Sequence, residues 1–410
     1  HDATNDQESR TPRARCAAAA HPARYHWSQG SHRGRDVAPS GRIASGASGR
    51  DVLVLEEHEA VGRPVHCTGV LGHDAFSELD LPRDSILSIT RSAAFRSGHG
   101  DPVLIETDRV VATVVDRARF DAALADRARA AGAAVRTGSR VETVTVNGSG
   151  VSVEVRDAAP LSARAIVLAC GASYRFNRAL GLGIPSAYVQ SAQIETAFPA
   201  FPHIDVRMGR TIAPGGFAWA VPFNRGDVPH ARIGVLCEVD ARGRFLDVFK
   251  AISREHGAAA SLPEPRLKML PLGPVRKTVS DRVIAVGDAA GLVKPTTGGG
   301  IYYGLLSGTY AAETLDACLT SDRLGERDLR PYETRWRDRI GPDIRAGLAF
   351  RGLAARLGDR GIDSLVELAR VDGLVPLLKE TADFNWHRGA ALALLRHPAF
   401  RRAVISSIWS

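Results

Sequence analysis

The sequence predicts an α/β protein in which a parallel sheet is joined to an antiparallel sheet and a helical C-terminal region. Continuous apolar runs indicate parallel strands that are covered on both faces, and they are DVLVLEE (51–57), ARAIVLACGAS (163–173) and DRVIAVGDAAG (281–291). Residues 185–275 hold several β-type segments in succession, which indicate a separate antiparallel sheet. Residues 323–410 carry apolar side chains at helical spacing, among them Leu365, Leu368, Val371 and Leu374.

Shorter patterns predict the connecting elements. RSAAFRSG (91–98) and DPVLIETD (101–108) look like a hairpin pair, and residues 140–157 predict a second hairpin that turns at Asn147-Gly148. A helix is predicted in residues 116–138, because its apolar residues share one stripe and a glycine can end it. These residues are Phe120, Leu124 and Ala128, followed by Gly132.

Composition excludes several protein classes. The 410 residues are 44% hydrophobic and 24% charged, as in ordinary globular proteins. No uninterrupted apolar run reaches the length of a membrane span. The net charge is +8, and only five of the 53 basic residues are Lys, which suits the Arg bias of a GC-rich gene better than a nucleic-acid surface. We therefore expect no nucleic-acid partner.

The five cysteines are widely spaced and form no C-x-x-C motif. This argues against a disulfide framework or a metal site and suits a reducing compartment. We therefore expect a cytoplasmic protein without bound metal.

The first 50 residues raise a separate question. They show neither helical nor strand periodicity, and their Ser, Gly, Arg, Ala and His content predicts disorder. The acid-ended strand at 51–57 is typical of the second strand of a dinucleotide-binding fold. The first strand and the G-x-G-x-x-G phosphate loop should precede it, yet residues 1–50 contain no such loop, and the glycines at 45–49 leave no room for a helix.

We interpret the segment up to about residue 45 as translated out of frame, with a naturally diverged N-terminus as the rival explanation. Reading the gene in its other two frames upstream of Asp51 tests this interpretation. In either case, we expect weak or absent binding of a dinucleotide.

The segment 286–308, VGDAAGLVKPTTGGGIYYGLLSG, carries the chemistry. Gly287 permits a tight turn that places Asp288 at the end of a strand, where a carboxylate can accept hydrogen bonds from sugar-like hydroxyls. Three glycines, 298–300, then open a helix, whose free N–H groups and dipole favour an electron-rich or anionic ring. A plain glycine-rich turn is the alternative.

This segment resembles the second flavin-binding motif of the geranylgeranyl reductase family of FAD-dependent oxidoreductases, in the group that includes p-hydroxybenzoate hydroxylase. DVLVLEEHEAVGRPVHCTGVL (51–71) is similar to the family's second strand and its PxHCTG loop, residues 114–133 resemble its Arg-bearing helix, and GGFAWAVP (215–222) resembles its YxWxFP element. The likeness covers roughly residues 51–320.

The resemblance implies an FAD-binding Rossmann-like fold of the glutathione-reductase type with an inserted substrate sheet. It divides the chain as follows: an aberrant or disordered N-terminus (1–50), an FAD-binding domain (51–90 with 115–182 and 276–322), a substrate-binding antiparallel sheet domain (91–114 with 183–275) and a C-terminal helical region (323–410).

The resemblance also implies roles for single residues. Glu56 would bind the adenosine ribose, Arg117 would lie near the pyrophosphate or ribityl chain, Asp288 would hold the ribityl chain, and Gly298, Gly299 and Gly300 would lie against the flavin ring. Arg63, Gly287 and Gly291 complete the cofactor-binding set.

For the substrate, the resemblance implies a prenyl cavity lined by Phe217, Trp219 and Pro222. The catalytic candidates are His66 and Cys67 near the ring edge, with Tyr302 as a proton donor. Each residue has a plainer alternative, such as a solvated strand end for Glu56, a surface charge for Arg117, an inert thiol for Cys67 and core packing for the aromatic residues.

Three functions follow. The leading hypothesis is an FAD-dependent reductase of isoprenoid double bonds that acts on a prenyl lipid or prenyl diphosphate, with NAD(P)H or ferredoxin as electron donor. The alternatives are an FAD-dependent aromatic or polyketide monooxygenase and a non-catalytic prenyl-lipid-binding remnant. RHPAFRRAVISSIWS (396–410) offers a peripheral contact with the inner membrane face, or a packed terminal helix. The sequence does not predict the oligomeric state.

Overall fold

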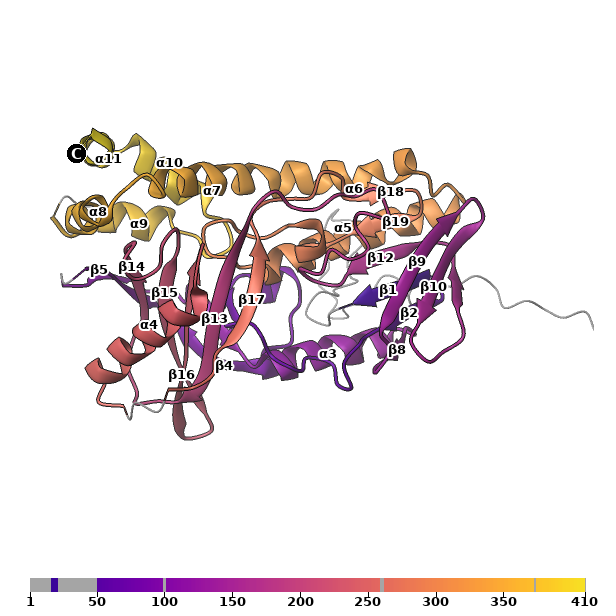
Figure 1. Ribbon diagram of the computed structural model, residues 1–410, viewed down its shortest axis with the longest axis horizontal. Coiled ribbons are helices and arrows are strands. Elements are labelled where there is room, and N and C mark those ends of the chain that lie inside the picture. The colour runs from indigo at the N-terminus through magenta and orange to yellow at the C-terminus, as the bar shows by residue number, and fades with distance from the viewer. Residues whose placement is uncertain (1–15, 21–49, 99–100, 259–261, 372–373, 410) are drawn as a thin grey trace, which may run out of the picture.

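The computed structural model describes residues 16–20, 50–98, 101–258, 262–371 and 374–409. Two large sheets lie toward opposite ends of an elongated molecule, and long helices run along one side from one sheet to the other (Figure 1). The candidate site described below lies where the two halves meet.

The first large sheet has six strands. Its order is β18 (Val279–Ser280), β19 (Val283–Ala285), β12 (Ile166–Ala169), β1 (Cys16–Ala20), β2 (Val52–Leu55) and β8 (Ala134–Arg136). All neighbours pair in parallel except β18 and β19, which are antiparallel. The three predicted apolar runs therefore lie in one sheet, and the buried side chains of β2, β12 and β19 form much of the main core.

Strand β1 corrects the expectation that residues 1–50 contain no strand. Cys16–Ala20 lies at the centre of the sheet, paired with β12 on one side and β2 on the other. Its CAAAA sequence carries no alternation, and alanine is a weak strand former, so the pattern was missed. A parallel strand between two partners needs only a short apolar run. The out-of-frame interpretation concerns the segment up to about residue 45, of which only Cys16–Ala20 belongs to the described residues.

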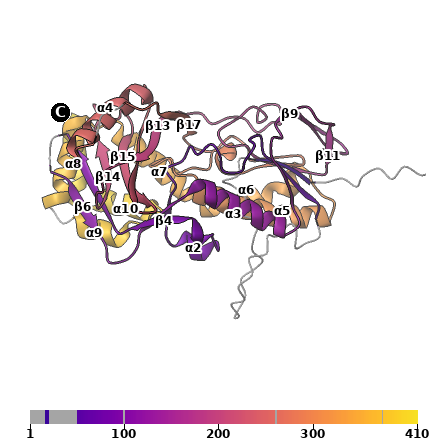
Figure 2. The ribbon, with the colours of Figure 1, turned by 90° about the horizontal axis from the view of Figure 1, so that it is seen from below.

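Helices and a small sheet flank this parallel sheet. The predicted helix is confirmed as α3 (Arg117–Ala130), which buries Phe120, Leu124 and Ala128 and stops before Gly132 at φ +95°. Helix α3 extends from near β4 (Figure 1 and Figure 2) toward β8 of the parallel sheet (Figure 1). The Asn147 hairpin is confirmed as β9 (Val141–Asn147) and β10 (Gly150–Val155), and β11 (Leu161–Ala163) completes this sheet.

Helix α5 (Ile301–Thr320) is the helix predicted to follow the three glycines 298–300. Most of its side chains are buried, because α6 packs against it and the parallel sheet lies beside it. The short 3₁₀ helix η3 (Gly287–Ala290) precedes it after β19. The start of α5 is thus fixed inside the protein, which gives the glycine turn a rigid support.

The second large sheet has seven strands. Its order is β17 (Arg266–Pro271), β13 (Tyr188–Ala197), β16 (Val228–Cys237), β15 (Phe217–Arg225), β14 (Ile204–Met208), β5 (Ser92–Ser97) and β6 (Val103–Glu106). The predicted β5–β6 hairpin is confirmed. The pairing is antiparallel throughout, apart from the parallel pair β14 and β5.

Each face of this sheet packs differently. Helix α4 (Ala241–Glu255) covers one face, and its buried residues share a core cluster with Ala218 and Ala220. The opposite face carries a separate apolar cluster that includes Trp219, Val221 and Leu236. This second cluster borders the candidate site.

A small sheet connects the two halves. It has the order β3 (Val70–Gly72), β7 (Ala112–Val115) and β4 (Ile86–Thr90), with α2 (Ala75–Glu78) and η2 (Arg83–Ser85) between its strands. Strand β7 was predicted with the substrate domain for most of its length, but it pairs with β3 and β4 instead.

Helices form the C-terminal region, as the sequence predicts. They are α6 (Glu326–Arg339), α7 (Gly341–Ala354), α8 (Asp359–Val371), α9 (Leu374–Thr381), α10 (Arg388–Arg396) and α11 (Pro398–Trp409). Helix α8 packs against β5 and β6, and an apolar cluster around Leu374, Phe400 and Val404 holds α8–α11 together. Among the described residues, no helix combines the length and apolar composition needed to span a membrane.

Candidate functional site

The acid at the end of β2 is positioned to bind a ligand. Glu56 is 1% exposed, and one of its carboxylate oxygens accepts hydrogen bonds from the backbone N–H and ring Nδ1 of His58 at 3.0 and 2.5 Å. Its other oxygen, Oε2, is buried without a hydrogen-bond partner among the described residues. Burial raises the pKa of Glu56, and the His58 contacts oppose that shift. A ligand hydroxyl could donate the hydrogen bond that this buried oxygen lacks.

The second part of the site is the turn after β19. Asp288 is 3% exposed, and its backbone carbonyl accepts a hydrogen bond from the Tyr174 hydroxyl at 2.6 Å. Gly287 and Gly291 both have φ in the left-handed region, at +55° and +71°. A Cβ at Gly291 would lie 2.2 Å from the Gly273 carbonyl oxygen, so the close packing of this turn requires glycine.

The Asp288 turn and the triple glycine lie side by side. A Cβ at Gly300 would be only 2.5 Å from Asp288 Oδ1, so the carboxylate packs directly against the first turn of α5. The two sequence motifs therefore pack against each other, which brings a carboxylate beside the N-terminal end of a helix.

The glycine turn also borders the apolar face of the seven-stranded sheet. A Cβ at Gly298 would lie 3.0 Å from Leu270 and 3.6 Å from Leu236, which belong to β17 and β16. Both leucines belong to the cluster that contains Phe217 and Trp219, whose rings are 5.6 Å apart. The Trp219 indole nitrogen is buried without a partner among the described residues. An apolar surface thus begins where the glycine turn ends.

Pro222 does not share this surface. The strand β15 alternates regularly against β16, which places Pro222 on the face opposite to Phe217 and Trp219. Its predicted role in lining the prenyl cavity is therefore wrong. The motif comparison gave equal weight to all three positions, although side chains in a strand alternate between faces.

The loop that contains His66 and Cys67 lies against the start of α3. Arg117 is buried and pairs with Asp121 at 3.0 Å. Burial would lower the pKa of Arg117, but Asp121 and then Cys67 hold it above its usual value. A Cβ at Gly69 would lie 2.6 Å from the Arg232 guanidinium and 3.2 Å from Arg117, which explains the glycine in HCTG.

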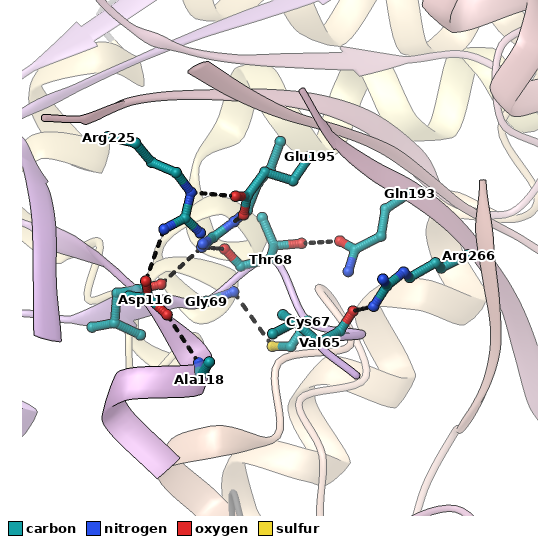
Figure 3. A network of polar contacts seen from close by, with 12 residues as sticks. Val65, Cys67, Thr68, Gly69, Asp116, Ala118, Gln193, Glu195, Arg225 and Arg266 are labelled. Atoms are coloured by element: carbon teal, nitrogen blue, oxygen red, sulfur yellow. Dashed lines mark hydrogen bonds and ion pairs between the residues drawn. The ribbon is translucent and has the colours of Figure 1, made fainter. Parts of the chain in front are cut away.

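An ion-pair network holds this loop to the seven-stranded sheet (Figure 3). Arg232, 2% exposed, donates to Glu195 at 2.8 Å and to the carbonyls of Thr68 and Val115 at 2.6 and 2.9 Å. Arg225 donates to Glu195 at 2.6 Å and to Asp116, the N-cap of α3, at 2.8 Å.

The network shifts the pKa values of the acidic and basic side chains within it. Burial raises the pKa of Glu195, but hydrogen bonds from Arg225 and the charge of Arg232 bring the net pKa below its usual value. Burial lowers the pKa of Arg232, and Glu195 opposes the shift. The pairing keeps Glu195 charged and so ties the loop and α3 to the substrate sheet.

Lys268 lies between the Asp288 turn and the loop that contains His66, and sequence reasoning missed it. Its Nζ lies 3.7 Å from Asp288 Oδ2. Burial lowers the pKa of His66, and the positive charges of Lys268 and Arg266 lower it further. Nδ1 of His66 is buried without a partner among the described residues. His66 therefore lies close to Lys268, which itself contacts Asp288.

The remaining predicted residues lie elsewhere. The Tyr302 hydroxyl donates to Glu78 at 2.5 Å, and no hydrogen bond within the described part of the chain links it to His66 or Cys67. Burial and Glu78 raise the pKa of Tyr302 beyond the usual tyrosine range. Arg63 is exposed. The structure thus unites the Asp288 turn with the glycines and leaves Tyr302 and Arg63 outside.

Comparison with known proteins finds reductases that are similar to this chain over most of its length. No family model matches the chain. A digeranylgeranylglycerophospholipid reductase from Methanocaldococcus jannaschii is 27% identical over 348 residues, covering 81% of this chain and 88% of the relative. Digeranylgeranylglycerophospholipid reductase 2 from Methanothermobacter thermautotrophicus is 29% identical over 356 residues, covering 80% and 90%.

The crystal structure of a geranylgeranyl bacteriochlorophyll reductase-like protein from Thermoplasma acidophilum matches with a TM-score of 0.77 and 21% identity, over 96% of this chain and 99% of that one. The resemblance to the geranylgeranyl reductase family is confirmed. The halogenase PltM in complex with FAD matches the fold at a TM-score of 0.61 and 16% identity, over 97% and 91%. The likeness in fold thus extends over both large sheets and the helical region.

The described residues fit two parts of FAD, the cofactor of the geranylgeranyl reductase family. The unpartnered Glu56 oxygen suits a ribose hydroxyl at the end of the second strand. The Asp288 carboxylate, which packs against Gly300 at the glycine turn, suits the hydroxyls of the ribityl chain. The segment after β1, where dinucleotide-binding folds carry their phosphate loop, is outside the described residues.

Proposed function

We propose that the chain is an FAD-dependent oxidoreductase that reduces carbon–carbon double bonds in the prenyl chains of an isoprenoid lipid. The contact between Asp288 and Gly300, immediately beside the Leu236 and Leu270 surface, carries this proposal. It supplies a flavin surface that continues directly into an apolar surface. The similarity to the archaeal digeranylgeranylglycerophospholipid reductases supports the same substrate class.

The chain's own residues would bind the cofactor, orient the substrate and exclude water from the site. Asp288 would hold the ribityl chain by accepting hydrogen bonds from its hydroxyls, and the N-terminal end of α5 would stabilise negative charge on the ring. When bound, FAD supplies the hydride that an alkene carbon accepts. Phe217, Trp219 and Leu270 keep water from an isolated alkene, which is a poor electrophile and reacts only when it is well aligned.

The proton that completes the saturation needs a donor, and His66 and Cys67 are our candidates. His66 is half-buried, and Lys268 couples it electrostatically to the Asp288 side of the site. Cys67 lies against Arg117 and Arg232. Replacing each residue in turn by Ala, with Tyr302→Phe as the comparison, should identify the donor through lost saturation with retained flavin.

The finer assignments are also proposals. NAD(P)H or ferredoxin is the expected electron donor. The C-terminal helices offer a contact with anionic lipid, because Arg401 and Arg402 are exposed on α11 near Ile405, which is 56% exposed. Sedimentation with vesicles of phosphatidylglycerol against vesicles of phosphatidylcholine tests this contact.

The activity test uses the full chain with excess FAD, since residues 1–50 contain no G-x-G-x-x-G loop. Under anaerobic conditions with dithionite, a geranylgeranyl lipid should gain two hydrogens per double bond by mass spectrometry. Oxygen-dependent hydroxylation would instead support the monooxygenase alternative. Retention of prenyl lipid without flavin absorbance, even after the reading frame is restored, would support the non-catalytic alternative.

A further inference from the structure

Lys294 is a buried charged residue in the loop between η3 and α5, and the proposed chemistry does not use it. It is 3% exposed. Its backbone N–H donates to the Gly299 carbonyl at 3.0 Å, and its carbonyl accepts from the Gly298 N–H at 2.8 Å. Its side-chain stem passes 3.6 Å from where a Cβ at Gly299 would lie. The backbone of Lys294 thus closes the glycine turn with two hydrogen bonds, and its side chain packs against Gly299.

The ammonium group points to the C-terminal region. It donates to the carbonyl of Phe384 and lies 5.0 Å from the centre of the Phe384 ring and 5.9 Å from that of Tyr303. Titratable groups face it from α5, α7 and the segment 382–387, and they are Tyr303, Asp343, Asp383 and His387. No carboxylate of the described residues lies within ion-pair distance of this ammonium.

The segment 382–387, which we call the tail loop, covers the back of the glycine turn. His387 Nδ1 is 2.5 Å from the Thr296 hydroxyl, and Trp386 packs on Tyr302 and Tyr303. Asp343 accepts hydrogen bonds from the Tyr303 hydroxyl and from the His387 and Arg388 backbones at 2.8, 3.2 and 2.9 Å. These contacts fix the tail loop, so it can serve as an anchor.

A buried ammonium without an ion-pair partner is costly to the fold. Burial lowers the pKa of Lys294 to about 7, although Asp343 and Asp383 oppose the shift. A methionine would fill a similar volume without this penalty. The chain uses only five lysines among its 53 basic residues, and this one adjoins the glycine turn. A residue that costs stability at a ligand surface indicates a role at that surface.

We propose that Lys294 is a positioning residue of the flavin surface, whose ammonium ties the turn 294–300 to the tail loop and so fixes the three glycines. The tie itself is a property of the chain without cofactor, and only its effect on flavin rests on the proposed function.

The experiment measures amide hydrogen exchange and urea unfolding of the full chain, comparing the wild type with Lys294→Met. We expect the Gly298 and Gly304 amides to exchange about tenfold faster in the variant, as the loss of one charge-assisted hydrogen bond implies. The unfolding midpoint should stay equal or rise, since the buried charge is gone. Lys277→Met, at the half-exposed pair with Glu326, is the matched control and should leave both amides unchanged.

Unchanged exchange in Lys294→Met would overturn the proposal, and so would faster exchange together with a lower midpoint, because that pair indicates ordinary packing. The wild type gives a second measurement without any substitution. Raising the pH from 6 to 8.5 deprotonates Lys294 and should speed exchange of the same amides, after correction for the intrinsic rate. No change there would also overturn the proposal.

Flavin titration separates this inference from the proposed function. We expect Lys294→Met to bind FAD more weakly than the Lys277→Met control. If none of the proteins binds FAD, the proposed function fails while the exchange result still decides the tie. If all bind FAD equally while exchange differs, the tie exists but does not position the flavin surface, and the proposal is overturned.

Discussion

Replacing Gly300 by alanine tests the packing on which the site depends. The new Cβ would lie 2.5 Å from Asp288 Oδ1, whereas ordinary contacts begin near 3.4 Å, so one group must move by about 0.9 Å. Asp288 is 3% exposed and cannot move into solvent. Overpacking of this kind costs about 1–3 kcal/mol of unfolding free energy. Gly300 has φ −113°, so no backbone strain contributes to the loss.

Gly299→Ala is the matched control one residue away. Its Cβ would meet the Thr297 hydroxyl at 3.4 Å and Lys294 at 3.6 Å, which are ordinary contacts. Alanine in place of glycine also reduces the entropy of the unfolded chain, so the control should be neutral or up to about 1 kcal/mol more stable. Urea unfolding followed by circular dichroism measures both variants. Equal stability of the two variants would refute the contact between Asp288 and Gly300.

Three further predictions concern charge. Glu56→Gln should weaken FAD binding by about 10-fold or more, because a neutral amide replaces the carboxylate at the unpartnered Oε2 position, and fluorescence titration measures it. Burial lowers the pKa of Lys294 to about 7, whereas the unfolded chain keeps a pKa of about 10.4, so between these values the unfolded state binds more protons than the folded state. The free energy of unfolding should therefore rise as the pH increases from 7 to 8.5, by at most about 1.4 kcal/mol per pH unit. Urea titrations of Lys294→Met should show no such rise. Arg232→Met should lower the free energy of unfolding by about 3–5 kcal/mol, because Glu195 and two backbone carbonyls lose their hydrogen-bond donor. Arg242→Met, at an exposed ion pair, should lower it by about 1 kcal/mol or less. Similar urea midpoints for the two variants would contradict the network.

Local motifs made part of the site predictable. Glu56, Asp288 and Gly300 each lie at a strand end or helix start, and such positions follow from a short stretch of sequence. Two of these stretches meet in space because a strand end leads through η3 into α5, within a few residues of chain. The distance between the motifs is therefore fixed locally.

Residues that reach the site from distant strands were not predictable in this way. Lys268 and Arg232 come from β17 and β16, and only the register of the seven-stranded sheet brings them to the loop at 66–69. Their pairing depends on long-range contacts that a single sequence does not display. The scarcity of lysine in an Arg-rich chain was a usable signal, since both Lys268 and Lys294 lie at the site.

The central place of β1 has a consequence for how the chain is made. This strand leaves the ribosome before both of its partners, and one of them, β12, follows only about 150 residues later. Until both neighbours exist, the nascent sheet cannot close. A truncation that removed Cys16–Ala20 would leave β2 and β12 with bare facing edges in the middle of the sheet, and unpaired edges of that kind recruit strands from other molecules. The five residues of β1 therefore protect the facing edges of β2 and β12 from pairing with strands of other molecules.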